Sequence, residues 1–506
     1  MLTANMFFSY SKVFHQPGSG GVLNLPFQRP IESCRKFTSQ VIESVISNIT
    51  SKVSKVKEQI GYSHQQIVNL DLARLFANAY PNTLDTTIQS TACLDPSADD
   101  CLPLSFVITG DINAMWLRDS ANQLMAYVDY LQHDIRLKKL FLGTIYLQAN
   151  FINIDPYSNA FNQPQSMEAL ANGTLSNRDL TQSESVYERK WEIDSLASFL
   201  SLSYRYWQTT GDDSFMNQTV WIDAVDAILN TLKKEQEPTF NLTSGEPLET
   251  DYEFKQTTDR PTENQFIDGR GQPVAYTGMV KSLFRPSDDA TVFTYFIPGN
   301  AMMSVELNHL SEMLISSRLN RTEMANEAAR LSKEIRDGIY AHGIINHTTF
   351  GQVFAYEVDG YGSSLIMDDA NVPSLLSLSL IGFLEQNDTI YQNTRRLVWS
   401  KHNPYFFSGP RGSGIGGPHV GLSYEWPMSQ IVRILSSSDD DEIREGLSSV
   451  LSSTDNTGLI HESINVYKQN GGDGNSGYTR PWFAWANGLF GQAILKIANE
   501  RPYLIF

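Results

Sequence analysis

Cysteine is scarce in this chain of 506 residues, which contains only Cys34, Cys93 and Cys101. Three cysteines exclude a small fold that depends on many disulfides. Cys93 and Cys101 flank a turn-rich segment, so they could pair in an oxidising compartment or stay free thiols in a reducing one. Acidic residues outnumber basic ones, and the formal net charge is −18. Such a charge repels nucleic acid phosphates and anionic membrane surfaces.

Long apolar runs and several familiar motifs are missing too. No stretch of about 18 apolar residues occurs, so we expect no membrane-spanning helix. The chain lacks a Walker A motif, a G-x-G-x-x-G after a strand, a G-x-S-x-G and a C-x-x-C, which leaves nucleotide-binding, serine hydrolase and thiol-redox functions without support. It also lacks the H-E-x-x-H and EF-hand patterns, so we expect no metal and no other cofactor. A standard signal peptide is not evident at the N-terminus.

Helical spacing of apolar residues dominates the chain from about Ser63 onward. Short and long connections alternate between the expected helices, and the short ones force neighbours to run antiparallel. Helical hairpins arranged in a ring form an (α/α)6 barrel, and we predict an all-α fold of this type. The pattern predicts twelve helices, at about 64–79, 119–132, 136–151, 195–208, 218–234, 298–316, 322–340, 372–384, 387–400, 425–437, 440–452 and 480–497.

The rest of the chain suggests one large domain with two additions. Residues 1–30 contain Gly, Pro and isolated apolar residues without periodicity, which predicts a mobile N-terminal arm. No linker rich in Gly, Pro or Ser divides residues 31–506, so we expect them to form the single barrel domain. Residues 235–284 contain Pro, Gly, Thr and alternating apolar residues, which predicts a small β-hairpin insertion beside the barrel.

The long connections before the even-numbered helices combine carboxylates with Trp, Tyr, His or Arg. Aromatic faces stack on sugar rings, while carboxylates and guanidinium groups bind hydroxyls and perform acid–base chemistry. A ring of hairpins would place all six connections at one end of the barrel. They are Gly110–Ser120, Tyr187–Ser195, Phe284–Phe293, Ile366–Ser374, Gly414–Pro427 and Leu459–Trp482.

The first two of these loops contain candidates for sugar binding. A planar guanidinium beside a carboxylate suits two adjacent hydroxyls, so Arg118 and Asp119 could bind a sugar in a pocket shaped by Trp116. The alternative is that Asp119 caps the following helix and Arg118 pairs with a neighbouring acid. Asp194, close to Glu192, has two equally weighted interpretations, a role in the pocket or an N-cap.

Two pairs of aspartates follow in the third and fourth loops. Asp288 and Asp289 are adjacent like charges, and such a pair can raise one pKa as a general acid requires. The alternative for them is capping or solvated charge. Asp368 and Asp369 precede Asn371, and hydroxyl recognition or capping is favoured there because no metal-binding motif accompanies them.

The last two loops supply a histidine and a glutamate. His419 follows two glycines and a proline, where backbone can approach a ligand closely, and binding and structural roles carry equal weight. Glu462 lies away from any expected helix start, so capping does not explain it and a role as a base is favoured.

Together these loops and their flanking helices resemble glycoside hydrolase family 125, the exo-acting α-1,6-mannosidases. The resemblance runs from about residue 80 to the C-terminus and implies an (α/α)6 barrel, removal of terminal α-1,6-linked mannose, inversion at the anomeric carbon and no metal. Glu425 departs from the family pattern, which has an apolar residue there, and could alter the rim of the pocket. The matching motifs are GDINAMWLRDSANQL, WEIDSL with YWQTTGD, FRPSDDATVFTYFIPGNAM, MDDANVPSLLSL, GIGGPHVGLSYEWPMS and TRPWFAWANGLFGQ.

The segment WLRDS is also similar to the sugar-binding segment of glucoamylase-type barrels, in which the acid lies between helices five and six and the base between helices eleven and twelve. Counting helices by this analogy predicts Asp289 or Asp288 as the acid and Glu462 as the base. In inverting enzymes the two carboxyl groups stand about 6.5–9.5 Å apart. The resemblance implies that the terminal mannose is held by Trp116, Arg118, Asp119, Asp194, Asp368, Asp369, His419, Trp426 and Arg480.

Two other functions stay open at this point. One is another inverting glycosidase of glucoamylase or trehalase type, and the other is a catalytically silent glycan-binding protein, which would not need two acids in opposite gaps. The expected partner is a mannose-containing oligosaccharide or glycan, and the sequence does not reveal the oligomeric state.

The compartment also stays open. Sequons for N-glycosylation are present, although chance alone gives several in a chain this long. A mannosidase of N-glycans belongs in the lumen of the secretory pathway or in the vacuole, which favours these places slightly over the cytoplasm. The sequons include Asn48, Asn172, Asn217, Asn241, Asn320, Asn346 and Asn387.

Overall fold

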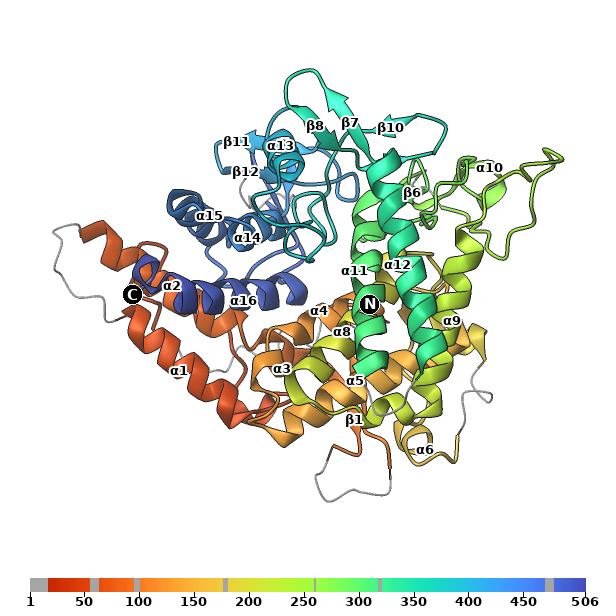
Figure 1. Ribbon diagram of the computed structural model, residues 1–506. Coiled ribbons are helices and arrows are strands. Elements are labelled where there is room, and N and C mark those ends of the chain that lie inside the picture. The colour runs from red at the N-terminus through yellow and green to blue at the C-terminus, as the bar shows by residue number, and fades with distance from the viewer. Residues whose placement is uncertain are drawn as a thin grey trace.

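The computed structural model describes residues 17–54, 63–94, 101–175, 181–258, 261–316, 321–468 and 477–506. Its inner helices form a ring in which α4 contacts α8, α8 contacts α11, α14 contacts α16, and α16 returns to α4 (Figure 1). The inner helices are α4 (Leu117–Met125), α8 (Ile193–Thr210), α11 (Ile297–Ser316), α14 (Pro427–Leu435) and α16 (Ala484–Glu500).

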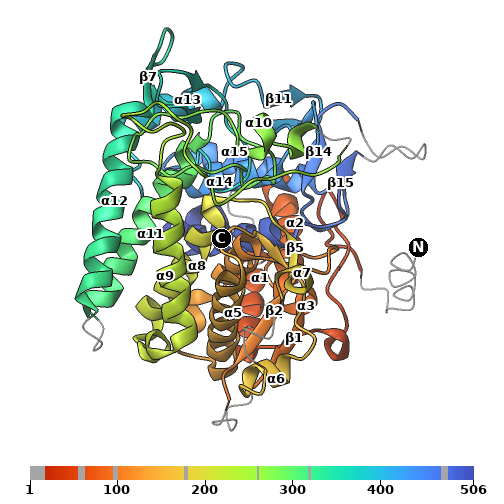
Figure 2. The ribbon, with the colours of Figure 1, turned by 90° about the vertical axis from the view of Figure 1, so that its right-hand side faces the viewer.

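Outer helices pack against this ring. Figure 2 shows α11 and α12 side by side along most of their length, and α14 packs on α15 in the same way. Together the two sets of helices form the (α/α)6 barrel that the sequence predicts. The outer helices are α2 (Ser63–Ala79), α5 (Ile135–Ile154), α9 (Thr219–Glu235), α12 (Thr322–His342), α13 (Thr389–Val398) and α15 (Asp440–Ser453).

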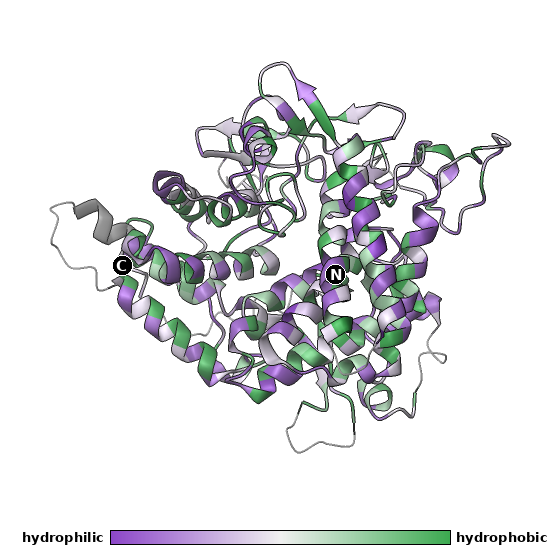
Figure 3. Cartoon of the chain, in the orientation of Figure 1, coloured by the Kyte–Doolittle hydropathy of each residue, from purple (hydrophilic) through white to green (hydrophobic). Residues whose placement is uncertain are grey.

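The burial pattern separates outer from inner helices. The outer helix α12 buries Ala325, Ala328, Leu331, Ile335 and Ile339, a spacing of three or four residues that gives one apolar stripe. Hydrophilic residues cover much of its remaining surface (Figure 3). The inner helix α11 instead buries residues on several faces, because it contacts α8 as well as α12. The hydrophobic core therefore lies between the two rings.

Very short strands lead directly into three of the inner helices and position the loops before them. Each strand pairs antiparallel with a loop from another gap, so the loops are tied to one another at one end of the barrel. The strands before α4, α11 and α14 are β3 (Met115–Trp116), β6 (Tyr295–Phe296) and β13 (Tyr424–Glu425). Their three-stranded sheets are completed by β4 (Ala160–Phe161) and β5 (Val186–Glu188), by β9 (Glu357–Val358) and β10 (Ser364–Leu365), and by β14 (Ser463–Asn465) and β15 (Tyr478–Thr479).

The helix predicted at 372–384 is wrong, because turns occupy this segment. Side chains replace the hydrogen bonds of a helix there. The Asp368 carboxylate accepts from the backbone N–H groups of Leu375 at 2.8 Å and Leu376 at 3.0 Å. Ser374 and Ser377 each accept a backbone N–H from the other through the side-chain oxygen. Aspartate and serine side chains that bind nearby backbone in this way compete with helix formation.

The prediction of a mobile arm at 1–30 does not hold for its second half, while residues 1–16 lie outside the described ranges. The backbone N–H of Leu23 donates to Asp71 Oδ2 at 2.8 Å, which fixes the segment on α2. Arg29 is buried and forms an ion pair with Asp85 at 2.7 Å. Residues 17–30 are therefore an ordered strap across the outer ring.

Two further differences concern local elements. Helix α1 (Gln40–Ser54) packs on α2 and was not predicted, although its buried Ile42, Ile46, Ile49 and Val53 have helical spacing. In the described part of 235–284, Phe240 and Pro247 form an isolated antiparallel bridge in place of the predicted hairpin.

The two-stranded hairpins lie elsewhere, as β1 (Ile88–Ala92) with β2 (Leu104–Val107), β7 (Ile344–His347) with β8 (Gly351–Phe354), and β11 (Phe406–Gly409) with β12 (Gly412–Ile415). Among the described helices, none combines the length and apolar character needed to cross a bilayer.

Candidate active site

A pocket opens where the loops before the inner helices meet. It holds about 480 Å³ of empty space, its open mouth included. Five of the six predicted loops contribute to its wall. The lining residues are Thr109, Asp111, Ile112, Trp116, Arg118, Asp119, Pro286, Ser287, Asp288, Asn371, His419, Trp426, Glu462, Arg480, Phe483 and Trp485.

Most residues predicted for the site lie in this wall. The remaining loop, Tyr187–Ser195, is fully described and lies behind the wall instead. The predicted residues that the structure brings together are Trp116, Arg118, Asp119, Asp288, His419, Trp426, Glu462 and Arg480.

Arg118 organises carboxylates, as the alternative interpretation of this residue proposed. Its Nη1 lies 2.6 Å from Glu192 Oε2 and 3.3 Å from Asp194 Oδ2. Its Nη2 lies 3.3 Å from Asp288 Oδ1, and its Nε lies 3.5 Å from Asp119 Oδ2. Each guanidinium nitrogen therefore faces a carboxylate of the protein instead of being free to bind a sugar hydroxyl. Burial raises the pKa of Asp119 to about 6, although the charge of Arg118 opposes the shift.

The adjacent aspartates of the third loop point to different places. Asp288 has a backbone φ of +66°, a left-handed conformation that aspartate tolerates better than most residues. Its side chain is 23% exposed and lines the pocket. Asp289 is buried, accepts a hydrogen bond from Ser287 Oγ at 3.1 Å, and lies 3.6 Å from His419 Nδ1. Of the two predicted acids, Asp288 is therefore the one that can reach a ligand.

Asp288 is coupled to Glu192, whose carboxyl is buried behind it. Asn159 Nδ2 lies 3.3 Å from Asp288 Oδ1 and 3.2 Å from Glu192 Oε1. Burial raises the pKa of Glu192 well above its usual range, against the charge of Arg118. Burial also acts to raise the pKa of Asp288, but Lys190 and Arg118 outweigh it and lower that pKa to about 2. Of the two carboxyls, Glu192 is therefore the one whose surroundings favour the protonated form.

Glu462 also lines the pocket, and both of its oxygens accept hydrogen bonds. The antiparallel pairing of Ser463 with Thr479 places the Thr479 hydroxyl 2.8 Å from Glu462 Oε2. Arg480 Nε donates to Glu462 Oε1 at 2.8 Å, and its Nη1 contacts Asp111. These contacts fix the plane of the carboxylate. Arg480 is thus a positioning residue for Glu462, a role that the sequence did not reveal.

Aromatic and cationic groups complete the wall. The indole N–H groups of Trp116 and Trp426 are buried and have no hydrogen-bond partner among the described residues, so both can donate to a ligand hydroxyl. The ring of His419 meets Trp426 edge-on, with centroids 6.2 Å apart. Burial opposes protonation of His419, but the adjacent carboxylate of Asp289 outweighs it and raises the pKa of the imidazole to about 9. His419 therefore carries a positive charge at neutral pH.

Three predicted binding residues do not line the pocket. Asp194 is fully buried against Arg118, and Asp368 caps the turns at Leu375 and Leu376. Asp369 Oδ1 accepts hydrogen bonds from both the backbone and side-chain nitrogens of Asn371, each at 3.0 Å. Asn371 is the residue of this loop that reaches the pocket. The carboxylates of Asp194, Asp368 and Asp369 support the pocket wall, because the loop backbone and Arg118 need hydrogen-bond acceptors in the protein interior.

Glu425, which was expected to alter the rim, lies inside the protein instead. It is 3% exposed, on β13 directly before Trp426. Burial raises the pKa of Glu425 to about 7, although the charge of Arg411 opposes the shift. Within the described ranges, Glu425 Oε2 has no hydrogen-bond partner.

Several site residues have no clear signal in the sequence. Asn159 reaches the acid pair because β4, which follows it, pairs with β3 before α4. Lys190 forms an ion pair with Glu188 at 3.0 Å, and its charge acts on Asp288. Asn159 lies outside the six predicted loops, and Lys190 lies in the second of them but was not among the predicted site residues. Glu192 was visible only as an acidic neighbour of Asp194.

No group of three or more His, Cys, Asp or Glu side chains is arranged to hold a metal ion in the part of the chain that the structure describes. The sequence matches the model of the metal-independent α-mannosidases, family GH125, over residues 69–495. This chain belongs to glycoside hydrolase family 125. It is a glycoside hydrolase of the mannosidase class.

Individual relatives agree with this family 125 assignment. The chain is 45% identical over 502 residues to the meiotically up-regulated gene 157 protein of Schizosaccharomyces pombe, which covers 98% of this chain and 93% of that protein. A structure from Streptococcus pneumoniae, a metal-independent α-mannosidase in a non-productive complex with α-1,6-mannobiose, is 30% identical. It superposes with a TM-score of 0.77 and covers 92% of this chain and 100% of that one.

Proposed function

We propose that this family 125 protein removes terminal α-1,6-linked mannose and inverts the configuration at the anomeric carbon. One observation carries the proposal: Asp288 and Glu462 line the same pocket, although they come from the loops before α11 and α16. An inverting glycosidase requires such a pair, one acid for the leaving oxygen and one base for water. The mannobiose bound by the pneumococcal relative supports the linkage.

In this mechanism Asp288 protonates the glycosidic oxygen and Glu192 supplies the proton. Asp288 is the member of the pair that reaches the pocket, and Glu192 is the member whose pKa burial raises. Asn159 Nδ2, within 3.3 Å of both carboxyls, holds them in register. The glycosidic bond breaks as the oxygen of the leaving sugar gains the proton.

Glu462 accepts a proton from the water that attacks the anomeric carbon from the opposite face of the ring. Thr479 and Arg480 hold its two oxygens, so the carboxylate does not need to reorient as the water approaches. Removal of one proton from water and delivery of one proton to the leaving sugar balance each other. The product is mannose with the β configuration.

The remaining wall binds the terminal sugar. The free indole N–H groups of Trp116 and Trp426 and the side chain of Asn371 are positioned to bind hydroxyls. Asp119 and the positively charged His419 also line the pocket and give it both an acceptor and a donor. Five loops wall this pocket at one end of the barrel, which favours binding of one chain end and exo action on a mannose-containing glycan.

Hydrolysis of α-1,6-mannobiose followed by proton NMR tests the activity and the stereochemistry together. We expect β-mannose as the first product, activity that EDTA does not change, and no release of glucose from maltose or trehalose. Initial appearance of α-mannose would overturn inversion. Binding of mannobiose without release of mannose would indicate a glycan-binding protein.

Two substitutions test the roles of the acids. Asp288→Asn and Glu462→Gln should each lower kcat by about 10²–10⁴-fold while the fold is retained, because each removes one proton transfer. Asp289→Asn is the matched control, since Asp289 lies next to Asp288 but does not line the pocket. A larger loss of kcat in Asp289→Asn than in Asp288→Asn would reverse the assignment of the acid.

A further inference from the structure

A disulfide lies in the hairpin of β1 and β2, outside the residues that line the pocket. Cys93 and Cys101 are bonded, with their Cα atoms 6.2 Å apart. Disulfides form and persist in oxidising compartments such as the secretory lumen, and are rare in the cytosol. Whether this disulfide forms therefore depends on the compartment in which the protein folds.

The N-x-T sequons provide a second, independent observation. Asparagine in such a sequence accepts an N-linked glycan only in the secretory lumen and only where it is exposed. All the sequon asparagines in the described part of the chain are exposed, and Asn320 lies outside it. They are Asn48, Asn172, Asn217, Asn241, Asn346 and Asn387. Nothing in the fold therefore prevents these sites from carrying a glycan.

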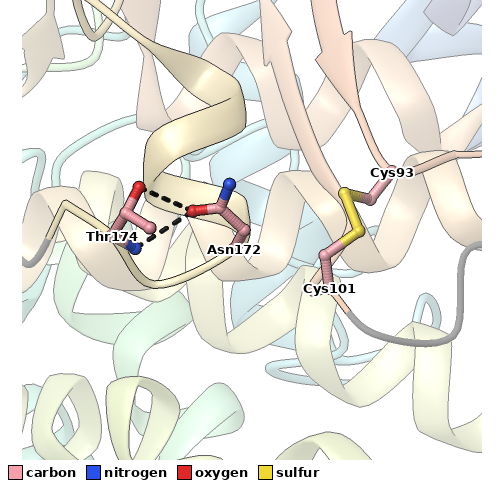
Figure 4. Close-up of a disulfide and its surroundings, with 4 residues drawn as sticks. All are labelled: Cys93, Cys101, Asn172 and Thr174. Atoms are coloured by element: carbon pink, nitrogen blue, oxygen red, sulfur yellow. Dashed lines mark hydrogen bonds between the residues drawn. A yellow bond between two sulfur atoms is a disulfide. The ribbon is translucent and has the colours of Figure 1, made fainter.

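Asn172 differs from the other sequons in its local geometry (Figure 4). It lies at the C-terminal end of α6 (Met167–Ala171), followed by Gly173 with a φ of +74°. Its Oδ1 accepts hydrogen bonds from Thr174 at two atoms, the backbone nitrogen at 3.0 Å and Oγ1 at 2.7 Å. Its Nδ2 has no hydrogen-bond partner among the described residues and points away from Thr174 in Figure 4. The turn therefore presents the amide nitrogen to solvent with the threonine hydroxyl beside the same amide.

Asn241 offers the most similar alternative and shows what is special at Asn172. Its Oδ1 accepts from the backbone nitrogens of Thr243 at 2.8 Å and Ser244 at 3.0 Å. At Asn172, the hydroxyl of the sequon threonine, Thr174, donates to the asparagine of the same sequon. Thr50, for comparison, donates to the backbone of its helix at Ile46.

We propose that Asn172 is an N-glycosylation site and that the protein matures in the lumen of the secretory pathway. The donor is an oligosaccharide linked to a lipid through pyrophosphate. The side-chain nitrogen of Asn172 forms a bond with C1 of the first sugar, while the bond from C1 to the pyrophosphate oxygen breaks. The lipid pyrophosphate leaves with that oxygen, and the proton that the nitrogen loses is released to water. Nothing is oxidised or reduced in this step. It rests on exposure and local geometry, and does not depend on the proposed mannosidase specificity.

The glycosylation site and the disulfide are neighbours in the fold. The backbone N–H of Leu102, next to Cys101, donates to the carbonyl of Ala171 at 3.0 Å. The disulfide thus restrains the hairpin against which the end of α6 is held. The hydrogen bonds of the sequon itself join residues only two positions apart, so this turn can form before the rest of the domain folds.

The test uses the protein purified from the cells that naturally make it, with variants introduced at its own gene. Peptide mass spectrometry follows treatment with an amidase that releases N-glycans in ¹⁸O-labelled water, which leaves a mass label at every occupied asparagine. We expect the label at Asn172 in the wild type and in Thr174→Ser, which keeps the hydroxyl. We expect it to be lost in Asn172→Gln and in Thr174→Ala, which keeps the asparagine. Mannosidase activity should be the same in all four proteins.

The same digest shows whether Cys93 and Cys101 are bonded to each other. We expect the peptide with Cys93 to be linked to the peptide with Cys101 before reduction. A wild-type protein without the label at Asn172 would overturn the site, even if Asn241 is labelled. Absence of both the label and the disulfide would overturn maturation in the lumen. Persistence of the label in Thr174→Ala would show that the threonine hydroxyl is not required.

Discussion

Replacement of Glu192 by Gln should change the pH dependence of kcat/KM rather than remove activity at every pH. Glu192 is 1% exposed, and burial raises its pKa well above the usual range, which favours its protonated, neutral form. Glutamine has a similar size and the same neutral charge, but it cannot release a proton. In the variant, Asp288 must therefore obtain its proton directly from solvent.

The size of the effect follows from the pKa of Asp288, which Lys190 and Arg118 lower to about 2 against the effect of burial. Each unit of pH changes the protonated fraction tenfold, so at pH 6 only about one Asp288 in 10⁴ would carry a proton. In Glu192→Gln, kcat/KM should consequently fall about tenfold for each unit of pH above about 3. In the wild type it should stay level until Glu192 itself ionises.

The assay measures initial rates on α-1,6-mannobiose below KM across the acidic and neutral range, since kcat/KM reports the ionisation of the free enzyme. Asp194→Asn is the matched control, because Asp194 contacts the same Nη1 of Arg118 and is equally buried. The pH profile of Asp194→Asn should keep a region in which kcat/KM does not depend on pH, even if the value of kcat/KM there changes. A level profile in Glu192→Gln, or the same sloping profile in Asp194→Asn, would refute a shared proton.

Three other predictions concern stability. The pKa of His419 is raised to about 9, so its ion pair with Asp289 stabilises the fold fully below about pH 6.5, and this stabilisation is lost as the pH rises towards 9. Thermal denaturation should show that His419→Gln is about 3 kcal/mol less stable than wild type at pH 6 and equally stable at pH 10. The pKa of Glu425 is raised from 4.5 to about 7, so the penalty on folding grows between these pH values and is complete above pH 7. Glu425→Gln should be about 3 kcal/mol more stable than wild type at pH 8 and equal at pH 4 in urea titrations. Replacing Cys93 and Cys101 by serine should cost about 2–3 kcal/mol, and an unchanged urea midpoint would contradict this.

The barrel could be predicted from the sequence because its helices alternate between short and long connections. Apolar spacing located the outer and inner helices except at 372–384, where the signal was the same but Asp368, Ser374 and Ser377 bind the backbone of turns instead. Apolar spacing cannot distinguish a helix from such a run of turns, since both bury the same side chains. Helix counting also placed Asp288 and Glu462 in gaps that share one pocket.

Finer features of the site depend on contacts between distant loops. Asp288 and Asp289 are neighbours with identical chemistry, and only the left-handed φ of Asp288 decides which one faces the pocket. The roles of Glu192 and Asn159 depend on strand pairing that joins loops from different gaps. Arg118 was visible as a candidate, but a sequence does not show how many acids surround one guanidinium.

The position of Arg118 has a consequence for how this enzyme can change. One guanidinium joins Asp119 at the start of α4, Glu192 before α8 and Asp288 before α11. These three segments therefore form one electrostatic unit, and a substitution in any of them alters the protonation of the others.

The part of the pocket wall with Asn371 and Trp426 is held by its own local hydrogen bonds and ring contacts. Laboratory selection for a different terminal sugar should therefore accumulate substitutions in this part of the wall. Lineages that begin with Arg118 should stall, because loss of the guanidinium leaves Asp119, Glu192 and Asp288 without their shared cation before a new substrate is gained.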